Sequence, residues 1–273
     1  MPRTLPRLSS RRHPVVTEFR QLAGRRRRTS AVLLDGSRLI ADALDAGLHL
    51  RTVLVSSEFL GASRASRELV RRALDARAVV YETTSPVIEA ASPVRTSSGI
   101  VAIADWTADS LEETFSPAPA LALGLVDVQD PGNVGAVIRS ADALEATGVV
   151  AIDRTADPGG WKTLRGAMGS TFRVPVAQAS LDVALAKARD LGLAVIATVA
   201  RGAPSIDRLD LTAPTLVLIG NEGAGLADEV TTRATGVVTV PIRKGVDSLN
   251  AAVTAGILLY EARRQRQSSK PAA

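Results

Sequence analysis

Short apolar runs alternate with amphipathic stretches along most of the chain, and this alternation predicts strands and helices in turn. An amphipathic helix is expected over 13–28, with Val16, Phe19 and Leu22 on one face. Four strands and three helices are expected after it, the strands at 32–34, 50–55, 78–81 and 100–104, and the helices at 37–46, 64–76 and 85–91. The regular order of strand and helix predicts a compact α/β domain.

A second α/β unit follows a segment with the composition of a linker. Residues 105–119 are polar and carry two prolines. Six strands are expected beyond them, at 121–126, 149–152, 172–176, 194–198, 216–219 and 237–240, with four helices at 134–144, 161–168, 181–190 and 250–265. We therefore expect a basic tail at 1–12, a first domain at 13–104, a linker at 105–119, a second domain at 120–266 and a tail at 267–273.

Composition narrows the chemistry available to this chain of 273 residues. It has no cysteine and only two histidines, which excludes disulfides and thiolate zinc sites and argues against a histidine metal site or a Ser-His triad. No metal is expected. No stretch approaches the roughly 18 consecutive apolar residues of a membrane helix, and the basic N-terminus lacks the apolar segment of a secretory signal. We expect a cytoplasmic protein without membrane contact.

The charge of the chain favours a polyanionic partner. Its net charge is +5, and only four of the 33 basic residues are lysines, so arginine dominates. The planar guanidinium of arginine can bond two phosphate oxygens at once. The run Arg25, Arg26, Arg27 and Arg28 at the end of the first helix is therefore a candidate nucleic-acid contact. The alternative is a solvated basic surface with no polyanion.

Two blocks near the C-terminus each lead from a strand of buried type into a polar, Gly-bearing turn. The block 216–226 ends its strand in Gly-Asn-Glu-Gly, at residues 220–223. The block 238–250 passes through Ser248 and Asn250 into an Ala-rich helix. Open α/β sheets bind small ligands at the carboxyl ends of their strands, so the two loops together are expected to wrap one ligand. The alternative is a pair of ordinary strand–turn–helix joints.

A third block, 125–149, ends a strand and enters a helix through a Pro-Gly-Asn turn. Asn133 is expected to cap this helix. Arg139 lies in an Ala/Val/Ile-rich helix, where a guanidinium is costly to bury without an anion, so it is a candidate phosphate or substrate anchor. The alternative is a salt bridge to Asp142 or Glu145. The GxGxxG dinucleotide signature and the P-loop lysine motif are absent.

These three blocks, in this order and spacing, resemble the three motifs of the SpoU/TrmH family of RNA ribose 2′-O-methyltransferases, within the SPOUT superfamily. The resemblance covers roughly residues 120–265 and is specific, because three separate motifs agree. The motifs are Asn133-Val-Gly-Ala-Val-Ile-Arg139, Ile219-Gly-Asn-Glu222-Gly-Ala-Gly225, and Val240-Pro-Ile through Ser248-Leu-Asn250. The first domain resembles the L30e-type RNA-binding domain of the ribosomal-RNA branch, with Leu34-Asp35-Gly36 near its start.

The resemblance implies an α/β SPOUT domain with a trefoil knot, S-adenosyl-L-methionine as cofactor, and a homodimer packed through the knot region. Carried over by position, the cofactor-binding residues are Thr198, Gly220, Val240 and Leu249. The catalytic residues are Asn133, Arg139, Glu222, Ser248 and Asn250. Arg139 is implied to activate the ribose hydroxyl while it contacts the target phosphate, because a free guanidinium is a very weak base. No DNA is expected as a partner.

Two segments depart from the pattern of the family. The ribosomal branch often carries a serine in the segment that here runs Arg165-Gly166-Ala167-Met168, so position 167 offers no hydroxyl, whereas Arg165 is still a candidate RNA contact. The turn at 145–148 lacks the aromatic residue common in the family. We expect this second departure to change only how the helix end packs.

We therefore expect an RNA (ribose-2′-O-)methyltransferase that acts on structured RNA, in the first place 23S rRNA. The nearest alternative is a tRNA 2′-O-methyltransferase, although the first domain argues against the minimal tRNA-modifying type. A second alternative is a non-catalytic RNA-binding or ribosome-assembly protein of the same fold, against which the intact catalytic set argues. Four questions stay open. They are which nucleotide is methylated, whether the protein confers antibiotic resistance, whether the substrate is free RNA or an assembling ribosomal subunit, and which subunit supplies Arg139 to each site.

Overall fold

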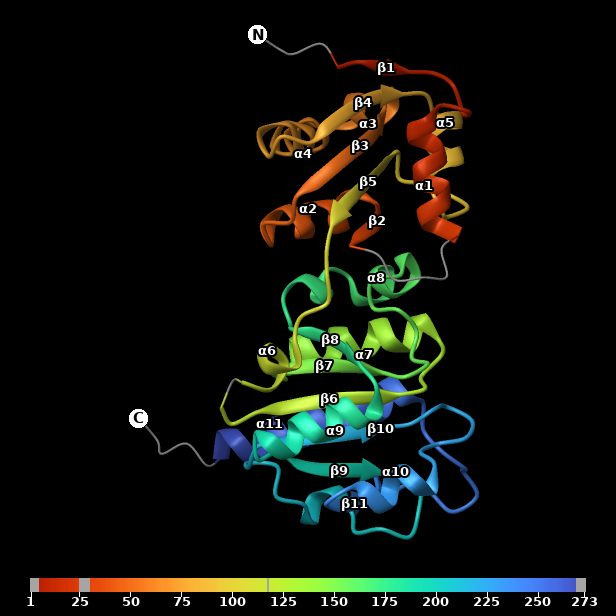
Figure 1. Ribbon diagram of the computed structural model, residues 1–273. Coiled ribbons are helices and arrows are strands. Elements are labelled where there is room, and N and C mark those ends of the chain that lie inside the picture. Colours follow the sequence, from red (N-terminus) through yellow and green to blue (C-terminus); the bar gives the residue numbers. More distant parts are fainter. Residues whose placement is uncertain (1–4, 25–29, 117, 269–273) are drawn as a thin grey trace. The chain divides into compact units, whose positions relative to one another are not determined.

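The computed structural model describes residues 5–24, 30–116 and 118–268, and the chain forms two compact units (Figure 1). The first unit comprises residues 1–107 and 159–172, and the second comprises residues 108–158 and 173–273. The candidate RNA contacts Arg25, Arg26, Arg27 and Arg28 lie outside the described residues. Among the helices that the structure describes, none combines the length and the apolarity needed to cross a lipid bilayer.

The first unit is a five-stranded sheet with helices on both faces. Its strands are β1 (Arg7–Leu8), β2 (Ala31–Asp35), β3 (Leu50–Ser56), β4 (Val79–Thr83) and β5 (Ile100–Asp105), in the order β1-β4-β3-β5-β2. Its helices are α1 (Pro14–Gly24), α2 (Ser37–Asp45), α3 (Ser57–Ala62), α4 (Arg64–Asp75), α5 (Ser85–Ala91) and α8 (Trp161–Ala167). One buried apolar cluster joins the sheet to α2 and α4, and another joins it to α1 and α5. Successive strand residues therefore face opposite cores.

Two short elements of this unit were not predicted from the sequence. Strand β1 pairs in parallel with the end of β4, and its Leu8 is only 4% exposed. Two residues carry no measurable periodicity, so the sequence pattern left them in the basic tail. Helix α3 follows β3 directly, and the Ser56 hydroxyl caps it by accepting from the Phe59 N–H at 3.1 Å.

The second unit is a fully parallel six-stranded sheet. Its strands are β6 (Leu121–Val126), β7 (Gly148–Ile152), β8 (Val176–Ala179), β9 (Ala194–Thr198), β10 (Thr215–Ile219) and β11 (Gly236–Val238), in the order β11-β9-β10-β6-β7-β8. Its helices are α6 (Leu111–Phe115), α7 (Pro131–Ala143), α9 (Leu181–Asp190), α10 (Asp228–Arg233) and α11 (Ala251–Ser268). Helices α6, α9 and α10 share an apolar cluster with the sheet, and α7 packs against α11. Every residue of β6, β7 and β10 is buried, as parallel strands covered on both faces require.

The strand predicted at 172–176 is wrong in its position, because β8 begins only at Val176. Residues Ser170–Phe172 form a 3₁₀ turn, and Pro175 has no N–H with which to extend the ladder. The Val176 N–H instead donates to the Asp109 carboxylate at 2.7 Å, where the strand starts. A second 3₁₀ turn, Ile206–Arg208, lies between β9 and β10.

The strand order determines which loops become neighbours. Because all strands of the second unit are parallel, their carboxyl ends lie at one edge of the sheet. Strand β10 lies between β9 and β6, so the loops that follow these three strands are adjacent. Helix α7 starts five residues after β6 ends and packs against α11. The trefoil knot implied by the family resemblance stays a prediction about the path from β11 to α11.

Residues 159–172 leave the second unit between β7 and β8 and join the core of the first. Leu164 is fully buried in the cluster under α2 and α4, where Phe172 also packs. Gly169 lies against α2, since an added Cβ would come within 2.3 Å of the Asp42 carboxylate. Local periodicity carries no information about contacts between distant segments. The domain boundary predicted at 105–119 therefore assigned residues 159–172 to the second domain.

Arg266 fixes the end of α11 to the start of the sheet. Its guanidinium donates at 2.6–3.2 Å to the carbonyl oxygens of Pro119, Ala120, Leu211 and Ala213, and burial lowers its pKa. We expect Arg266→Ala to destabilise the protein by about 2 kcal/mol, because four carbonyls lose a charged donor. Denaturant unfolding measures the change. Arg264→Ala, which loses only a surface ion pair with Glu261, is the control and should cost less than about 1 kcal/mol; equal unfolding midpoints for the two variants would contradict the assignment.

Candidate active site

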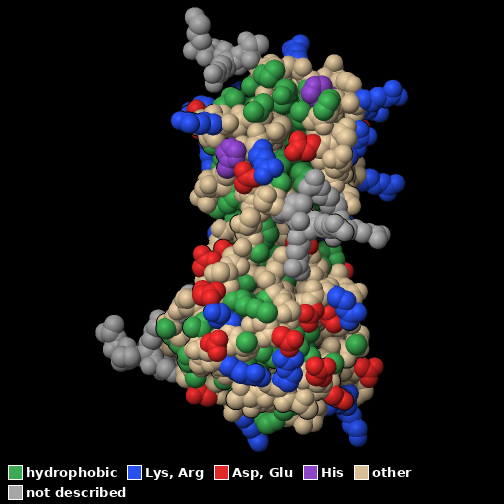
Figure 2. Space-filling model, in the orientation of Figure 1, with side chains coloured by type: hydrophobic (Ala, Val, Ile, Leu, Met, Phe, Trp, Pro, Cys, Tyr) green, Lys and Arg blue, Asp and Glu red, His purple; other side chains and the backbone are tan. Residues whose placement is uncertain are grey.

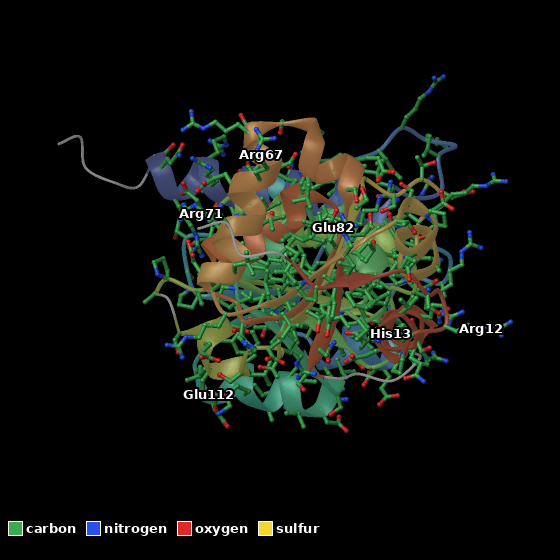
Figure 3. The ribbon with its side chains drawn as sticks, turned by 90° about the horizontal axis from the view of Figure 1, so that it is seen from above. Arg12, His13, Arg67, Arg71, Glu82 and Glu112 are labelled. Atoms are coloured by element: carbon green, nitrogen blue, oxygen red, sulfur yellow. The ribbon has the colours of Figure 1, made fainter. Side chains whose placement is uncertain are left out.

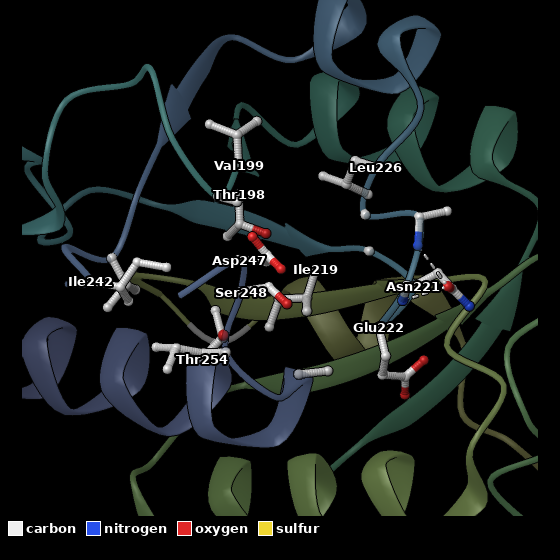
Figure 4. A pocket seen from close by; sticks show the side chains of 18 residues that line it. Thr198, Val199, Ile219, Asn221, Glu222, Leu226, Ile242, Asp247, Ser248 and Thr254 are labelled. Carbon is white, nitrogen blue, oxygen red and sulfur yellow. Dashed lines mark hydrogen bonds between the residues drawn. The ribbon is translucent and has the colours of Figure 1, made fainter. Parts of the chain in front are cut away.

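A cavity of about 330 Å³ lies at the carboxyl edge of the second unit's sheet (Figure 4). It is formed by the end of β9, the loop after β10 and the segment between β11 and α11. Its size lies at the lower end of the range for small-molecule sites. The cavity is lined by Thr198, Val199, Ala200, Ile219, Gly220, Asn221, Glu222, Gly223, Ala224, Gly225, Leu226, Val240, Ile242, Asp247, Ser248, Leu249, Ala251 and Thr254.

The loop after β10 is closed on itself by hydrogen bonds. The backbones of Asn221 and Gly225 exchange two bonds, at 2.9 and 3.2 Å. The Asn221 side-chain oxygen accepts from the N–H groups of Gly223 and Ala224 (Figure 4). Its amide donates to the Asp127 carbonyl at the end of β6. Gly220 is in close contact with this closure, since an added Cβ would lie 2.3 Å from the Gly225 carbonyl carbon. The loop is therefore held in one shape at the rim of the cavity.

A chain of side-chain hydrogen bonds joins the three sequence blocks. The Asn133 amide donates to the Glu222 carboxylate at 2.7 Å, and the Asn250 amide donates to the Asn133 side-chain oxygen at 2.9 Å. The Asn250 oxygen accepts from the N–H groups of Ala252 and Val253, which caps α11. Residues separated by more than a hundred positions are thus held in one polar cluster beside the cavity.

The prediction that Asn133 caps α7 is wrong. The cap is Asp130, whose carboxylate accepts from the Asn133 N–H at 2.9 Å, and Pro131 occupies the first turn. Aspartate is a strong N-cap and proline is well placed at the first helical position, so the helix begins three residues earlier than predicted. This start frees the Asn133 side chain for Glu222 and Asn250.

An ion pair also stabilises the end of strand β6. Asp127, which follows β6 with a φ of 56°, forms an ion pair with Arg154 at 2.9 Å. The hydrogen bond from Arg154 lowers the pKa of the Asp127 carboxyl, although the pair is largely exposed. Asp127 can therefore stay ionised at neutral pH while its carbonyl accepts from Asn221.

The structure places the expected cofactor residues together. Thr198, Gly220, Val240 and Leu249 all line the cavity, and the Thr198 hydroxyl is engaged with the Leu218 carbonyl at 2.8 Å. Of the expected catalytic residues, Glu222 and Ser248 line the cavity, whereas Asn133 and Asn250 reach it through Glu222.

Arg139 lies exposed on α7, the helix that Asp130 caps. The two carboxylates expected as alternative salt-bridge partners of Arg139 each form an ion pair with another arginine. Asp142 pairs with Arg173 at 2.8 Å, and Glu145 pairs with Arg263 at 3.1 Å. Arg165 is exposed on α8, in the first unit.

The cavity suits a ligand with an apolar part and a positive charge. Its wall includes the apolar side chains of Ile219, Leu226, Val240, Ile242 and Leu249. Two carboxylates, Glu222 and Asp247, line it, and no lysine, arginine or histidine is among its described lining residues. Asp247 was not predicted from the sequence as a site residue, although it directly precedes Ser248, which was. Within the described ranges, no group of three or more His, Cys, Asp or Glu residues could hold a metal ion.

Family models match both parts of the chain. A model described as the SpoU rRNA Methylase family matches residues 120–260, and a model described as the MRM3-like substrate binding domain matches residues 13–102. The two matched ranges do not overlap.

Relatives and solved structures resemble nearly the whole chain. An uncharacterised tRNA/rRNA methyltransferase of Synechocystis is 32% identical over 95% of this chain and 94% of its own length. A 23S rRNA (uridine(2479)-2′-O)-methyltransferase of Streptomyces viridochromogenes is 33% identical over 92% of this chain and 89% of its own length. The crystal structure of an AdoMet-bound rRNA methyltransferase from Sinorhizobium meliloti superposes with a TM-score of 0.85 at 30% identity, covering 95% of this chain and 98% of that one.

Proposed function

The chain belongs to the SpoU rRNA methylase family, and from this membership we propose that it transfers the methyl group of S-adenosylmethionine to a ribose 2′-hydroxyl of 23S rRNA. The observation that carries the proposal is the chain of hydrogen bonds from Asn250 through Asn133 to Glu222, at the rim of a cavity whose described lining residues include no basic side chain. It brings the family's three motifs together at one edge of the sheet. The relative from Streptomyces viridochromogenes, named for a uridine of 23S rRNA, supports the substrate.

The residues around the cavity fit the cofactor. We assign the backbone groups of Gly220, Val240 and Leu249 to the adenine, because all three residues line the cavity, and the two carboxylates match a ligand that carries positive charge. When bound, S-adenosylmethionine supplies a methyl group activated by its positively charged sulfur. The protein's part is to align the ribose hydroxyl and to exclude water. We assign Arg139 to the target nucleotide, where it contacts a phosphate and activates the hydroxyl.

The distribution of charge supports the first unit as the main RNA contact. Its residues, 1–107 and 159–172, include 19 basic and 10 acidic side chains, whereas the second unit has 14 basic and 18 acidic side chains. Exposed arginines such as Arg12 and Arg67 project outward from it (Figure 3), and acidic side chains are spread over the visible face of the second unit (Figure 2). Phosphate contacts by such residues give affinity that falls with salt. Arg165 and the run at 25–28 belong to this proposed RNA surface.

We assign the protein to the cytoplasm, and we infer that it forms a homodimer in which α11 lies at the interface. Val253, Ile257 and Tyr260 are 50%, 36% and 63% exposed, and their spacing of four and three residues puts them in one stripe on the helix. Apolar stripes of this kind are typical of surfaces that another protein covers. The stripe lies on the helix that Asn250 caps, so a second copy packed there would be close to the active site.

We expect Tyr260→Asp to convert a dimer of this protein into a monomer, because the new carboxylate would be buried against an apolar partner without a counter-charge. Sedimentation velocity measures the change. The control is Val183→Asp on α9, where the side chain is 55% exposed, and it should leave the dimer intact. If the Tyr260→Asp protein sediments as the wild type does, the assignment of α11 to the dimer interface is contradicted.

Methyl transfer in vitro tests the proposed reaction. The purified protein is incubated with S-adenosylmethionine carrying a labelled methyl group and with 23S rRNA or tRNA, and the RNA is digested to nucleosides. Label in a 2′-O-methylnucleoside from 23S rRNA is expected. Label in tRNA alone would favour the tRNA alternative, and label in a methylated base would contradict ribose transfer. RNA binding without any transfer would favour a non-catalytic assembly protein.

A further inference from the structure

Asp247 is an acidic side chain of the cavity for which the described part of the structure provides no partner. It lines the cavity beside Ser248, and Figure 4 draws both side chains among those that line it. No hydrogen bond or ion pair engages its carboxylate among the residues that the structure describes. The other cavity carboxylate, Glu222, already accepts from Asn133.

The backbone just before Asp247 is held by hydrogen bonds, and Asp247 itself is exposed to solvent while it lines the cavity. The Val246 carbonyl accepts from Arg201 at 2.6 Å, and the Val246 N–H donates to the Arg243 carbonyl at 3.2 Å. Gly245 adopts a φ of 96°, which turns the chain sharply before Asp247. Arg243 and Lys244 are its closest basic neighbours in the sequence, yet neither forms an ion pair with it within the described residues.

We propose that Asp247 binds a positively charged group of S-adenosylmethionine and thereby sets the charge preference of the cofactor cavity. This inference rests on the proposed function. The cofactor carries two cationic groups, the sulfonium and the α-ammonium, and an unpartnered carboxylate in a cavity without basic side chains is complementary to either. The demethylated product, S-adenosylhomocysteine, keeps only the ammonium. If Asp247 binds the sulfonium, methyl transfer removes that attraction and favours product release; if it binds the ammonium, the attraction is unchanged.

Three ligands separate these possibilities by isothermal titration calorimetry on the full chain. S-adenosylmethionine has both charges, S-adenosylhomocysteine has the ammonium alone, and 5′-methylthioadenosine has neither. Asp247→Asn is expected to weaken S-adenosylmethionine about tenfold and to leave 5′-methylthioadenosine unchanged. If S-adenosylhomocysteine weakens equally, the ammonium is the group bound; if it does not weaken, the sulfonium is. Asp190→Asn, which removes the same charge from the end of α9, is the control and should change none of the three affinities.

The proposal is overturned if Asp247→Asn binds S-adenosylmethionine as tightly as the wild type does. It is also overturned if all three ligands weaken together, because that pattern indicates a changed loop rather than a lost charge. A wild-type protein that binds none of the three would instead overturn the assignment of the cofactor. The two failures are therefore distinguishable in one set of titrations.

Discussion

Arg139→Ala is expected to slow methyl transfer to RNA about a thousandfold, while the affinity for S-adenosylmethionine stays the same. A positioned cation that holds the target phosphate and activates the hydroxyl acts in the transition state, and losing such a group typically costs two to three orders of magnitude. Arg139 does not line the cofactor cavity, so ligand binding there should not change. Single-turnover transfer and calorimetry measure the two quantities separately.

The role assigned to Arg139 depends on its shape as well as its charge. Arg139→Lys keeps the charge but loses the planar fork, so it should restore only part of the rate. Arg189→Ala, an exposed arginine on α9, is the control and should transfer at the wild-type rate. Full activity of Arg139→Ala would move the activation of the hydroxyl to another group.

Gly220→Ala is expected to lower the affinity for S-adenosylmethionine about a hundredfold. The added Cβ would lie 2.3 Å from the Gly225 carbonyl carbon and 2.5 Å from the Leu226 nitrogen. Both atoms belong to the backbone of a loop closed by hydrogen bonds, so the methyl group cannot be accommodated by a rotamer change. Overpacking of this kind costs about 1–3 kcal/mol and here deforms the cavity wall itself.

Gly223→Ala is the matched control for this variant. It lies three residues further along the same loop, and the nearest atom to its added Cβ is the Asn221 oxygen at 3.6 Å. Its affinity for S-adenosylmethionine should stay within about twofold of the wild type. Equal loss in both variants would mean that the loop responds to any added side chain, and no loss in Gly220→Ala would contradict the steric account.

Much of the fold could be predicted because the local pattern of apolar residues indicates its strands and helices. The parallel sheet of the second unit follows from apolar runs such as 121–126 and 216–219, which are buried on both faces. The family model match over 120–260 and the likeness to a solved SpoU methyltransferase confirm the predicted family and fold class. Periodicity alone could not have placed the five expected catalytic residues, and the family resemblance supplied them: Asn133, Arg139, Glu222, Ser248 and Asn250.

The features that escaped prediction depend on contacts between distant residues or on competition between nearby ones. Leu8 forms a strand only because β4 is there to pair with it. Leu164 is buried in the first unit although its neighbours in the chain belong to the second. Asn133 loses the capping position to Asp130, three residues earlier, and local propensity alone favours both residues almost equally.

The most direct test of the account is a map of ribose methylation in total RNA from a strain that lacks this gene and from its parent. We expect one 2′-O-methyl mark to disappear from 23S rRNA, and we expect the wild-type gene to restore it but the Arg139→Ala variant not to. That result would name the nucleotide as well as the reaction. A mark lost from tRNA instead would contradict the substrate, and an unchanged map would contradict the assignment of the chain as an active 23S rRNA methyltransferase.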